Sequence, residues 1–316
     1  MRQAWKKLRY RLEYIGLLLA AKLVPIFPRS AIGVLAKFCG AVASVVDVRG
    51  QRVALANLEC AFPGKYSTAE RRRIVRESYQ HFARTMLDLM WSPRLTPENF
   101  ARYIEFEGFS EAWRKQSVIV VCYHYSNFEW LSLGCGFFRW PAVIVAQEFK
   151  NPLLDPIFRR WREQSGHSFI ARTGGILRLF KTLRRGGNTA MLIDLTVLPD
   201  PAAVAIRCFG LYTSVTSAHV WLQQRSGATL IPAHCEPLPR GRYRIVLHPP
   251  IDLGPDASRR EVAQACWDSF EPVVRARPGP YMWMYKQWRY RAENPDRPYP
   301  FYSWHNVKFE RLIAQK

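Results

Sequence analysis

Residues 117–133 read SVIVVCYHYSNFEWLSL, an apolar run followed by a polar corner and a second apolar segment. Val118–Cys122 is short and rich in β-branched residues, which is typical of a fully buried strand. Ser126 or Asn127 can cap a following helix, with Glu129 in its first turn. The stretch therefore predicts a strand, a corner and a helix, with polar side chains where the strand ends.

His124 lies in this corner, five positions before Glu129. On a continuous helix that spacing would put the two side chains about 140° apart. In a strand-to-helix corner, the imidazole can instead swing back over the helix N-terminus and meet the carboxylate. A histidine held by a carboxylate at the mouth of a sheet is the arrangement expected of a general base. Spacing alone leaves equally open that these are two unrelated polar residues.

The composition indicates an anionic partner. The 316 residues include 46 Lys and Arg against 25 Asp and Glu, a net charge of +21, which suits nucleic acid, anionic lipid or an acidic protein. The 11 Trp, 14 Tyr and 18 Phe suit a membrane interface, and also stacking on single-stranded nucleic acid. Seven scattered cysteines without a Cys-x-x-Cys pair favour a reducing compartment and argue against a disulfide framework or a zinc knuckle.

The N-terminus combines basic and apolar residues. The apolar stretch Tyr14–Ala21 follows a basic start and is shorter than the roughly 20 residues of a transmembrane helix. A cleaved signal peptide is a competing interpretation. We favour an uncleaved anchor that lies in the interface or spans with Lys22 snorkelling outward. Ala31–Val46 is a second apolar segment that can pack beside it. We expect membrane-associated helices in residues 1–50 and one large domain in residues 51–316.

Elements alternate along the rest of the chain. The capping box Ser67-Thr68-Ala69-Glu70 opens a helix that we expect to run to about Trp91. Predicted strands follow at 117–122, 142–146, 189–193, 229–233 and 243–248, and predicted helices at 126–134, 152–165, 174–185 and 217–226. Such alternation predicts an α/β fold, with a mostly parallel or mixed central sheet flanked by helices.

Two further clusters carry polar groups. The first runs from Arg159 through a Gly-Gly turn at 174–175, and its guanidinium groups match phosphate oxygens. We favour a site role for Arg172, whereas the basic residues 178–185 suit a solvated helix face. The second cluster, Pro278–Arg291, interleaves aromatic residues with cations. It fits either a surface for lipid headgroups or bases, or a packed core helix.

Several segments match one family in the same order along the chain. They are Asn57–Pro63 (NLECAFP), His124–Trp130 (HYSNFEW, with His, four residues, then Glu), Asn151–Asp155 (NPLLD) followed by Arg160 and Arg172, Cys208–Gly210, Gly227–Pro232 and Pro280–Met284 (PYMWM). Together they resemble the bacterial lipid A late acyltransferase family, within the lysophospholipid acyltransferase-like group.

The resemblance implies a bacterial inner-membrane enzyme, facing the cytoplasm, that transfers a fatty acyl chain from acyl carrier protein or acyl-CoA to a hydroxyl of a lipid A-type glycolipid. His124 would be the general base, and Glu129 would fix its tautomer and stabilise the imidazolium. Transfer would be direct, with no cofactor or metal. Arg172 and Arg160 would bind acceptor phosphate, and Asn127 is a further substrate-binding candidate. The positive charge would hold an anionic membrane and attract an acidic carrier.

Two departures from the family pattern leave the acceptor open. Asp194-Leu195-Thr196 stands where the family commonly shows Asp-x-Asp, and Tyr285 stands where it shows His. Another glycolipid, a lysophospholipid or an amino-acid lipid is therefore an alternative acceptor. Non-catalytic alternatives are a silent scaffold and a basic membrane- or nucleic-acid-binding protein, although no nucleic-acid motif occurs and we expect no such partner. A metalloenzyme would lack the second histidine of a His-Glu-x-x-His helix.

Overall fold

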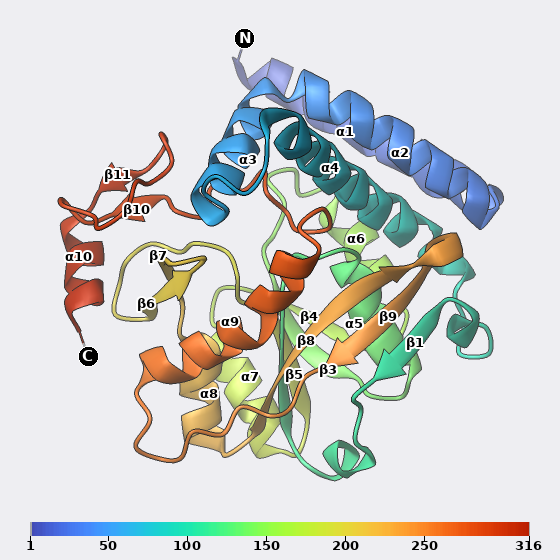
Figure 1. The fold of residues 1–316 in the computed structure, drawn as a ribbon. Helices are drawn as coiled ribbons and strands as arrows, with labels where there is room; N and C mark the ends of the chain where they lie inside the picture. Colours follow the sequence, from blue (N-terminus) through green and yellow to red (C-terminus); the bar gives the residue numbers. More distant parts are fainter. Residues whose placement is uncertain (1, 316) are drawn as a thin grey trace.

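A seven-stranded sheet forms the centre of the protein in a computed structural model that describes residues 2–315 (Figure 1). Its order is β1-β9-β8-β2-β5-β3-β4. The strands are β1 Ile104–Glu107, β2 Val118–Cys122, β3 Ala142–Ala146, β4 Ser168–Ala171, β5 Asn188–Leu192, β8 Thr229–Leu238 and β9 Arg242–Leu247. The block from β8 to β4 is parallel, whereas β9 runs antiparallel to β8 and parallel to β1. The predicted α/β class with a mixed sheet is confirmed.

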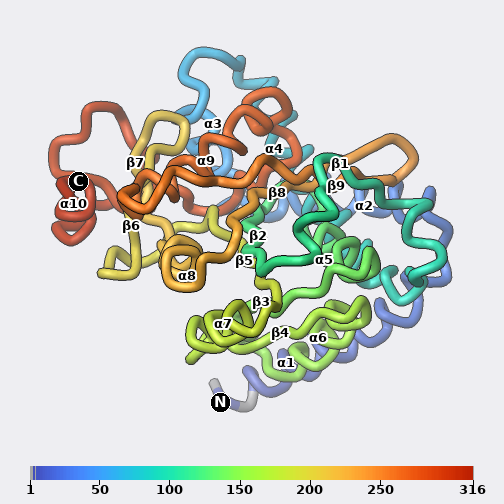
Figure 2. The backbone as a smooth tube through the Cα atoms, turned by 90° about the horizontal axis from the view of Figure 1, so that it is seen from below, coloured from blue at the N-terminus to red at the C-terminus, as the bar shows by residue number. Residues whose placement is uncertain are grey.

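Helices cover both faces of this sheet. They are α4 Thr68–Trp91, α5 Phe128–Phe137, α6 Asp155–Glu163, α7 Gly175–Arg184, α8 Ala218–Ser226 and α9 Arg259–Ala276. The predicted capping box is present, since the Ser67 and Glu70 side chains each accept from the other's backbone N–H. Figure 2 shows α6 and α7 next to β4, at the end of the sheet away from β1. The strands β1 and β4 and the helix α9 were not among the predicted elements.

The alternation of side chains along β2 explains the double cover. All five residues of β2 are buried. Ile119 and Val121 belong to a core that includes α7, α8 and α9, whereas Val118, Val120 and Cys122 belong to a second core that includes α5 and α6. Successive residues of a strand point to opposite faces, so a strand without polar positions needs apolar cover on both.

The N-terminal residues form three helices, α1 Arg2–Leu23, α2 Arg29–Val46 and α3 Val48–Ala61. Helix α2 packs along α4 at the top of Figure 1. Within residues 2–315, α2 alone is long and apolar enough to cross a membrane, a test that core helices and signal sequences also pass. The stretch Tyr14–Ala21 lies in the second half of α1, which is more polar than α2, and its role as an anchor stays a prediction.

The remaining elements follow β5 in the sequence and lie outside the central sheet. Strands β6 Ala203–Cys208 and β7 Leu211–Thr216 pair separately, as do the short β10 Tyr290–Arg291 and β11 Trp304–His305, and α10 spans Val307–Ala314. Tyr281, Trp283 and Trp288 are buried in the first core, but as part of a loop. The core interpretation of Pro278–Arg291 is therefore right about burial of these rings and wrong about a helix.

Candidate active site

His124 and Asp194 meet where two adjacent parallel strands end. The register of β2 and β5 pairs Cys122 with Leu192. His124 and Asp194 each lie two residues beyond, so they reach the same edge of the sheet. Their side chains are joined by a hydrogen bond of 2.8 Å between His124 Nδ1 and Asp194 Oδ1. The second carboxylate oxygen accepts the backbone N–H of His124 at 2.9 Å.

This pairing defines what the imidazole can do. A carboxylate only accepts hydrogen bonds, so the Nδ1 atom of His124 carries the proton and Nε2 is the nitrogen left to act as a base. The Asp194 side chain is 1% exposed and that of His124 is 11% exposed. The Phe128 ring and the imidazole pack at an interplanar angle of 65°, with 4.9 Å between ring centroids. The ring orientation is thus fixed by a buried carboxylate and an aromatic neighbour.

A tight corner presents His124. Ser126 has a φ of 49°, a left-handed conformation that is uncommon for a residue other than glycine. Two backbone hydrogen bonds join this corner to the loop of residues 280–288, the buried aromatic loop, which carries the rings of Tyr281, Trp283 and Trp288. Ser126 N–H donates to the Pro280 carbonyl at 2.9 Å, and Met282 N–H donates to the His124 carbonyl at 3.2 Å. The buried aromatic loop thus supports the strained corner.

Glu129 pairs with an arginine rather than with the imidazole. It lies in the first turn of α5, and Arg162 of α6 donates to it twice, at 2.9 Å from Nε and 2.5 Å from Nη2. Burial lowers the pKa of Arg162, but its pairing with Glu129 outweighs this and leaves the pKa raised. The prediction that Glu129 contacts His124 is wrong in this structure. The reason is sheet adjacency, because the end of β5 delivers Asp194 to the Nδ1 side of the ring.

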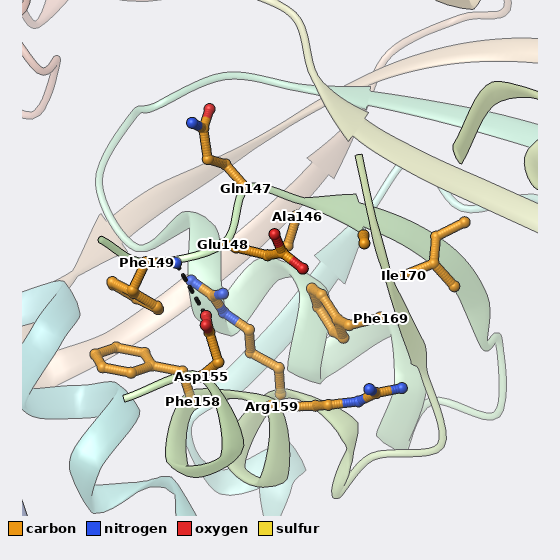
Figure 3. Close-up of a pocket in the computed structure, with 11 residues that line it drawn as sticks. Ala146, Gln147, Glu148, Phe149, Asp155, Phe158, Arg159, Phe169 and Ile170 are labelled. Atoms are coloured by element: carbon orange, nitrogen blue, oxygen red, sulfur yellow. Dashed lines mark hydrogen bonds between the residues drawn. The ribbon is translucent and has the colours of Figure 1, made fainter. Parts of the chain in front are cut away.

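A cavity of about 140 Å³ lies beside the Glu129–Arg162 pair. The loop after β3, the strand β4 and the helix α6 form its walls, through Ala146, Gln147, Glu148, Phe149, Asp155, Phe158, Arg159, Arg162, Phe169, Ile170 and Ala171. Figure 3 shows Phe149 and Phe158 on one side and Phe169 and Ile170 on the other. The Asp155 carboxylate accepts the Phe149 N–H at 3.0 Å and so shapes the loop. A cavity lined by both apolar and charged side chains suits an amphipathic ligand.

The other predicted site residues lie outside this cavity lining. Arg160 and Arg172 are exposed, and Arg172 directly follows the lining residue Ala171. Their role in binding phosphate stays a prediction. From the same cluster, it is Arg159 and Arg162 that line the cavity. On a helix, neighbouring residues point about 100° apart, so α6 cannot turn all three arginines to one wall.

Asn127 is buried and its amide group contacts the protein at both ends. Its oxygen accepts the Trp130 N–H at 3.0 Å, which caps α5, and its nitrogen donates to Asp88 at 3.0 Å. The cap confirms the predicted helix start. A contact between Asn127 and substrate stays a prediction, whereas its place in positioning the corner is visible in these hydrogen bonds.

Cys122 is the thiol closest to His124 along the chain. It is buried, and burial raises its pKa well above the ordinary value. A thiol becomes a nucleophile only as the thiolate, so this environment favours a packing role. The interpretation of Cys122 as a core residue agrees with its place in the second core.

Asp194 is the residue that sequence reasoning missed. It ends a predicted strand, 70 positions after His124, and was noted only for departing from a family pattern. The signal was available in the predicted sheet, because an acidic residue directly after a strand is a candidate partner for a base after a neighbouring parallel strand.

Comparisons with known proteins assign the chain to an enzyme family. A family model described as bacterial lipid A biosynthesis acyltransferase matches residues 2–290, and the chain belongs to that family. The lipid A biosynthesis lauroyltransferase of Escherichia coli is 24% identical, over 78% of this chain and 81% of its own length. The lipid A biosynthesis myristoyltransferase of the same organism is 24% identical, over 92% and 91%.

Among solved structures, the 1-acyl-sn-glycerophosphate acyltransferase PlsC of Thermotoga maritima covers 79% of this chain and 97% of its own, with 15% identity and a TM-score of 0.37. Family membership establishes that this protein is an acyltransferase.

Proposed function

We propose that the protein transfers a fatty acyl chain from an acyl thioester directly to a hydroxyl group of a lipid A-type glycolipid, with His124 as general base. The hydrogen bond between His124 and the buried carboxylate of Asp194 is the observation that carries this proposal. Nε2 removes the hydroxyl proton while the oxygen attacks the thioester carbonyl. The tetrahedral intermediate then expels the thiolate, which takes up that proton from the imidazolium. The products are an ester and a thiol.

In this proposal, Asp194 has the role that the sequence suggested for Glu129. It keeps the proton on Nδ1 and stabilises the imidazolium that forms during attack, as the acid of a catalytic triad does. Glu129 acts one step away. It holds Arg162, whose Nη1 is not used in the pair with Glu129 and whose side chain lines the cavity. A guanidinium there can bind a phosphate or stabilise negative charge that develops on the carbonyl oxygen.

The acceptor and donor follow from the relatives and the charge. Curated relatives are named lipid A lauroyl- and myristoyltransferases, which supports a lipid A-type acceptor and a saturated fatty acyl donor. The net charge of +21 suits an anionic donor, and both an acidic acyl carrier protein and the phosphate-bearing CoA thioester are donors of this kind.

The two departures from the family pattern favour a second candidate acceptor. Tyr285 donates its hydroxyl to the backbone carbonyl of Thr196 at 3.0 Å, so the two unusual positions touch. Both lie near Asp194. A change concentrated beside the base suits a different acceptor headgroup, such as another glycolipid, a lysophospholipid or an amino-acid lipid.

We also propose that residues 1–50 attach the protein to the cytoplasmic face of the bacterial inner membrane, either in the interface or across it. Large apolar side chains recur at three- and four-residue spacing along one face of each helix and are exposed: Leu8, Leu12, Ile15 and Leu19 on α1, and Val34, Phe38, Val42 and Val45 on α2. Such a face is typical of a helix that contacts lipid. Asn151, in the loop that joins the lining residue Phe149 to α6, donates to the Tyr10 carbonyl of α1 at 3.0 Å, so α1 contacts the segment that leads into the cavity wall.

The direct test is mass spectrometry of the total lipid and lipid A fractions from cells with and without the protein. We expect one acyl chain to disappear from lipid A when the protein is absent, and to return with the wild-type chain but not with His124→Ala. General-base catalysis contributes about 100- to 10,000-fold. A His124→Ala enzyme that keeps more than a tenth of the wild-type turnover would overturn the proposal. His305→Ala, on a partly exposed histidine far along the chain, is the matched control.

A further inference from the structure

A buried aspartate on α4 is surrounded by polar side chains from several elements. Asp88 is fully buried and lies in the last turn of α4. Four side chains converge on it: Arg29 at 2.5 and 3.1 Å, Arg84 at 2.8 Å, Tyr243 through its hydroxyl at 2.7 Å, and Asn127 through its amide at 3.0 Å. A buried carboxylate is tolerated when it is paired and hydrogen-bonded in this way.

One of these partners comes from the start of the apolar helix α2. Arg29 is the first residue of α2 and, apart from its bidentate contact with Asp88, it donates to the Gly241 carbonyl at 2.8 Å. Its guanidinium also stacks 4.4 Å from the Trp130 ring and 4.9 Å from the Trp91 ring. Arg29 thus fixes the beginning of α2 against α4 and α5 together.

Another partner comes from the corner that carries His124. Asn127 ends this corner and caps α5, and its amide nitrogen reaches Asp88. The preceding carbonyl, of Ser126, accepts the hydroxyl of Thr85, which lies one turn before Asp88 on α4. Asp194 therefore holds the beginning of the corner, through the His124 N–H, and α4 holds its end.

We infer that Asp88 and Arg29 are positioning residues for acyl transfer, because the chain of contacts Arg29–Asp88–Asn127 ties the His124 corner to the start of α2. The inference rests on the proposed role of His124. A displaced corner would move Nε2 away from the acceptor oxygen, and an error of about 1 Å in such a geometry can cost about 100-fold in rate. The link also makes the placement of α1 and α2 matter to catalysis although neither helix supplies a reacting group.

Arg29 is a better residue to substitute than Asp88 in a test of this inference. Removing Asp88 would leave two buried guanidinium groups without a counter-charge, and breaking a buried pair in this way costs about 3–5 kcal/mol, enough to prevent folding. Arg29→Gln removes one partner and keeps the pair of Arg84 with Asp88. Arg94→Gln is a matched control, because Arg94 donates to the Pro25 carbonyl of the same α1–α2 connection and stacks on Trp91, yet does not bond to Asp88.

The experiment compares kcat and KM of the full-length variants in mixed micelles of detergent and lipid A precursor, per folded molecule. We expect Arg29→Gln to lower kcat by about 10- to 100-fold with KM for the acceptor unchanged. Arg29→Lys should recover only part of the loss, because lysine keeps the charge but neither the bidentate contact nor the stacking. Arg94→Gln should stay within about twofold. A kcat for Arg29→Gln equal to that of Arg94→Gln, with both variants folded, would overturn the inference.

A double-mutant cycle tests the connection itself. If Arg29 acts through Asn127, the kcat of Arg29→Gln with Asn127→Ala should be no lower than that of Asn127→Ala alone. Fully additive losses would show that Arg29 acts by another route and would sink the inference. His124→Ala separates the two levels. If it keeps activity, the proposed base is wrong whatever Arg29 does, and if it loses activity while Arg29→Gln does not, only the inference fails.

Discussion

Two buried carboxylates lie near His124, and they differ in how the chain brings them there. Glu129 is close in sequence and sits on the next helix, whereas Asp194 is distant in sequence and lies two residues beyond the end of the neighbouring strand β5. Both are almost completely buried. Asp194 meets the imidazole, and Glu129 meets the guanidinium of Arg162. Adjacency of parallel strands placed the partner of the base, and closeness in sequence did not.

The largest expected effect comes from removing the carboxylate at the imidazole. Asp194→Asn keeps the shape but offers an amide, which can no longer hold the proton on Nδ1 and stabilise an imidazolium. We expect kcat to fall by about 1,000- to 10,000-fold, as for the acid of a catalytic triad. Single-turnover rates with a fatty acyl thioester measure this. Asp268→Asn, on an exposed acid of α9, is the control, and a loss under tenfold at Asp194 would contradict its assignment.

Glu129 should behave differently although its loss is also severe. Glu129→Ala leaves Arg162 without its partner, and we expect turnover to fall by about 100-fold through loss of an oriented cation at the cavity. Since the two residues form one unit, Glu129→Ala with Arg162→Ala should be little worse than either single variant. The dependence of kcat/KM on pH should keep its shape in Glu129→Ala and change in Asp194→Asn. A changed pH profile in Glu129→Ala would return that residue to the imidazole.

Glu129 and Asp194 also show how much of the structure could be predicted from the sequence. The strand Val118–Cys122 and the capped helix after it could be predicted because burial and capping are local properties. The pairing of strands β2 and β5 could not, because their order in the sheet depends on contacts between segments about 70 residues apart. The strand β4 and the helix α9 were missed for a different reason, because their local sequence signals are weak. Ser168–Ala171 is short and only partly buried, and Pro272 lies within α9.

A second comparison sets the proposed base, His124, against a structural histidine. His219, on α8, is completely buried, and burial lowers its pKa to about 4. The unfolded chain binds a proton near the ordinary value of about 6.5, so the folded state is disfavoured as the pH falls from about 6.5 to 4. The shift corresponds to about 3 kcal/mol of stability, which is fully present above pH 6.5.

His219→Met should remove the contribution of one histidine from the pH dependence of stability, without changing the pH profile of turnover. Urea unfolding at several pH values between 4 and 7 measures the slope. The control is His305→Met, since His305 is partly exposed. An unchanged slope in His219→Met would show that other groups, such as His81 or His248, whose pKa values burial also lowers to about 4, control acid stability.

The smallest effects are expected from the exposed arginines Arg172 and Arg160. Their substitution tests whether the acceptor is also bound outside the region of the two carboxylates. Arg172→Ala should raise the acceptor KM by about fivefold with kcat unchanged, because one charged contact at an exposed site contributes about 1 kcal/mol at most. Arg160→Ala should give a similar or smaller rise. Arg185→Ala, in the exposed basic residues at the end of α7, is the control. Raising the salt concentration should narrow the difference, since exposed charges are screened. If Arg172→Ala lowers kcat instead, the guanidinium acts on the reacting groups, and the cavity beside Arg162 extends farther toward α7 than its walls indicate.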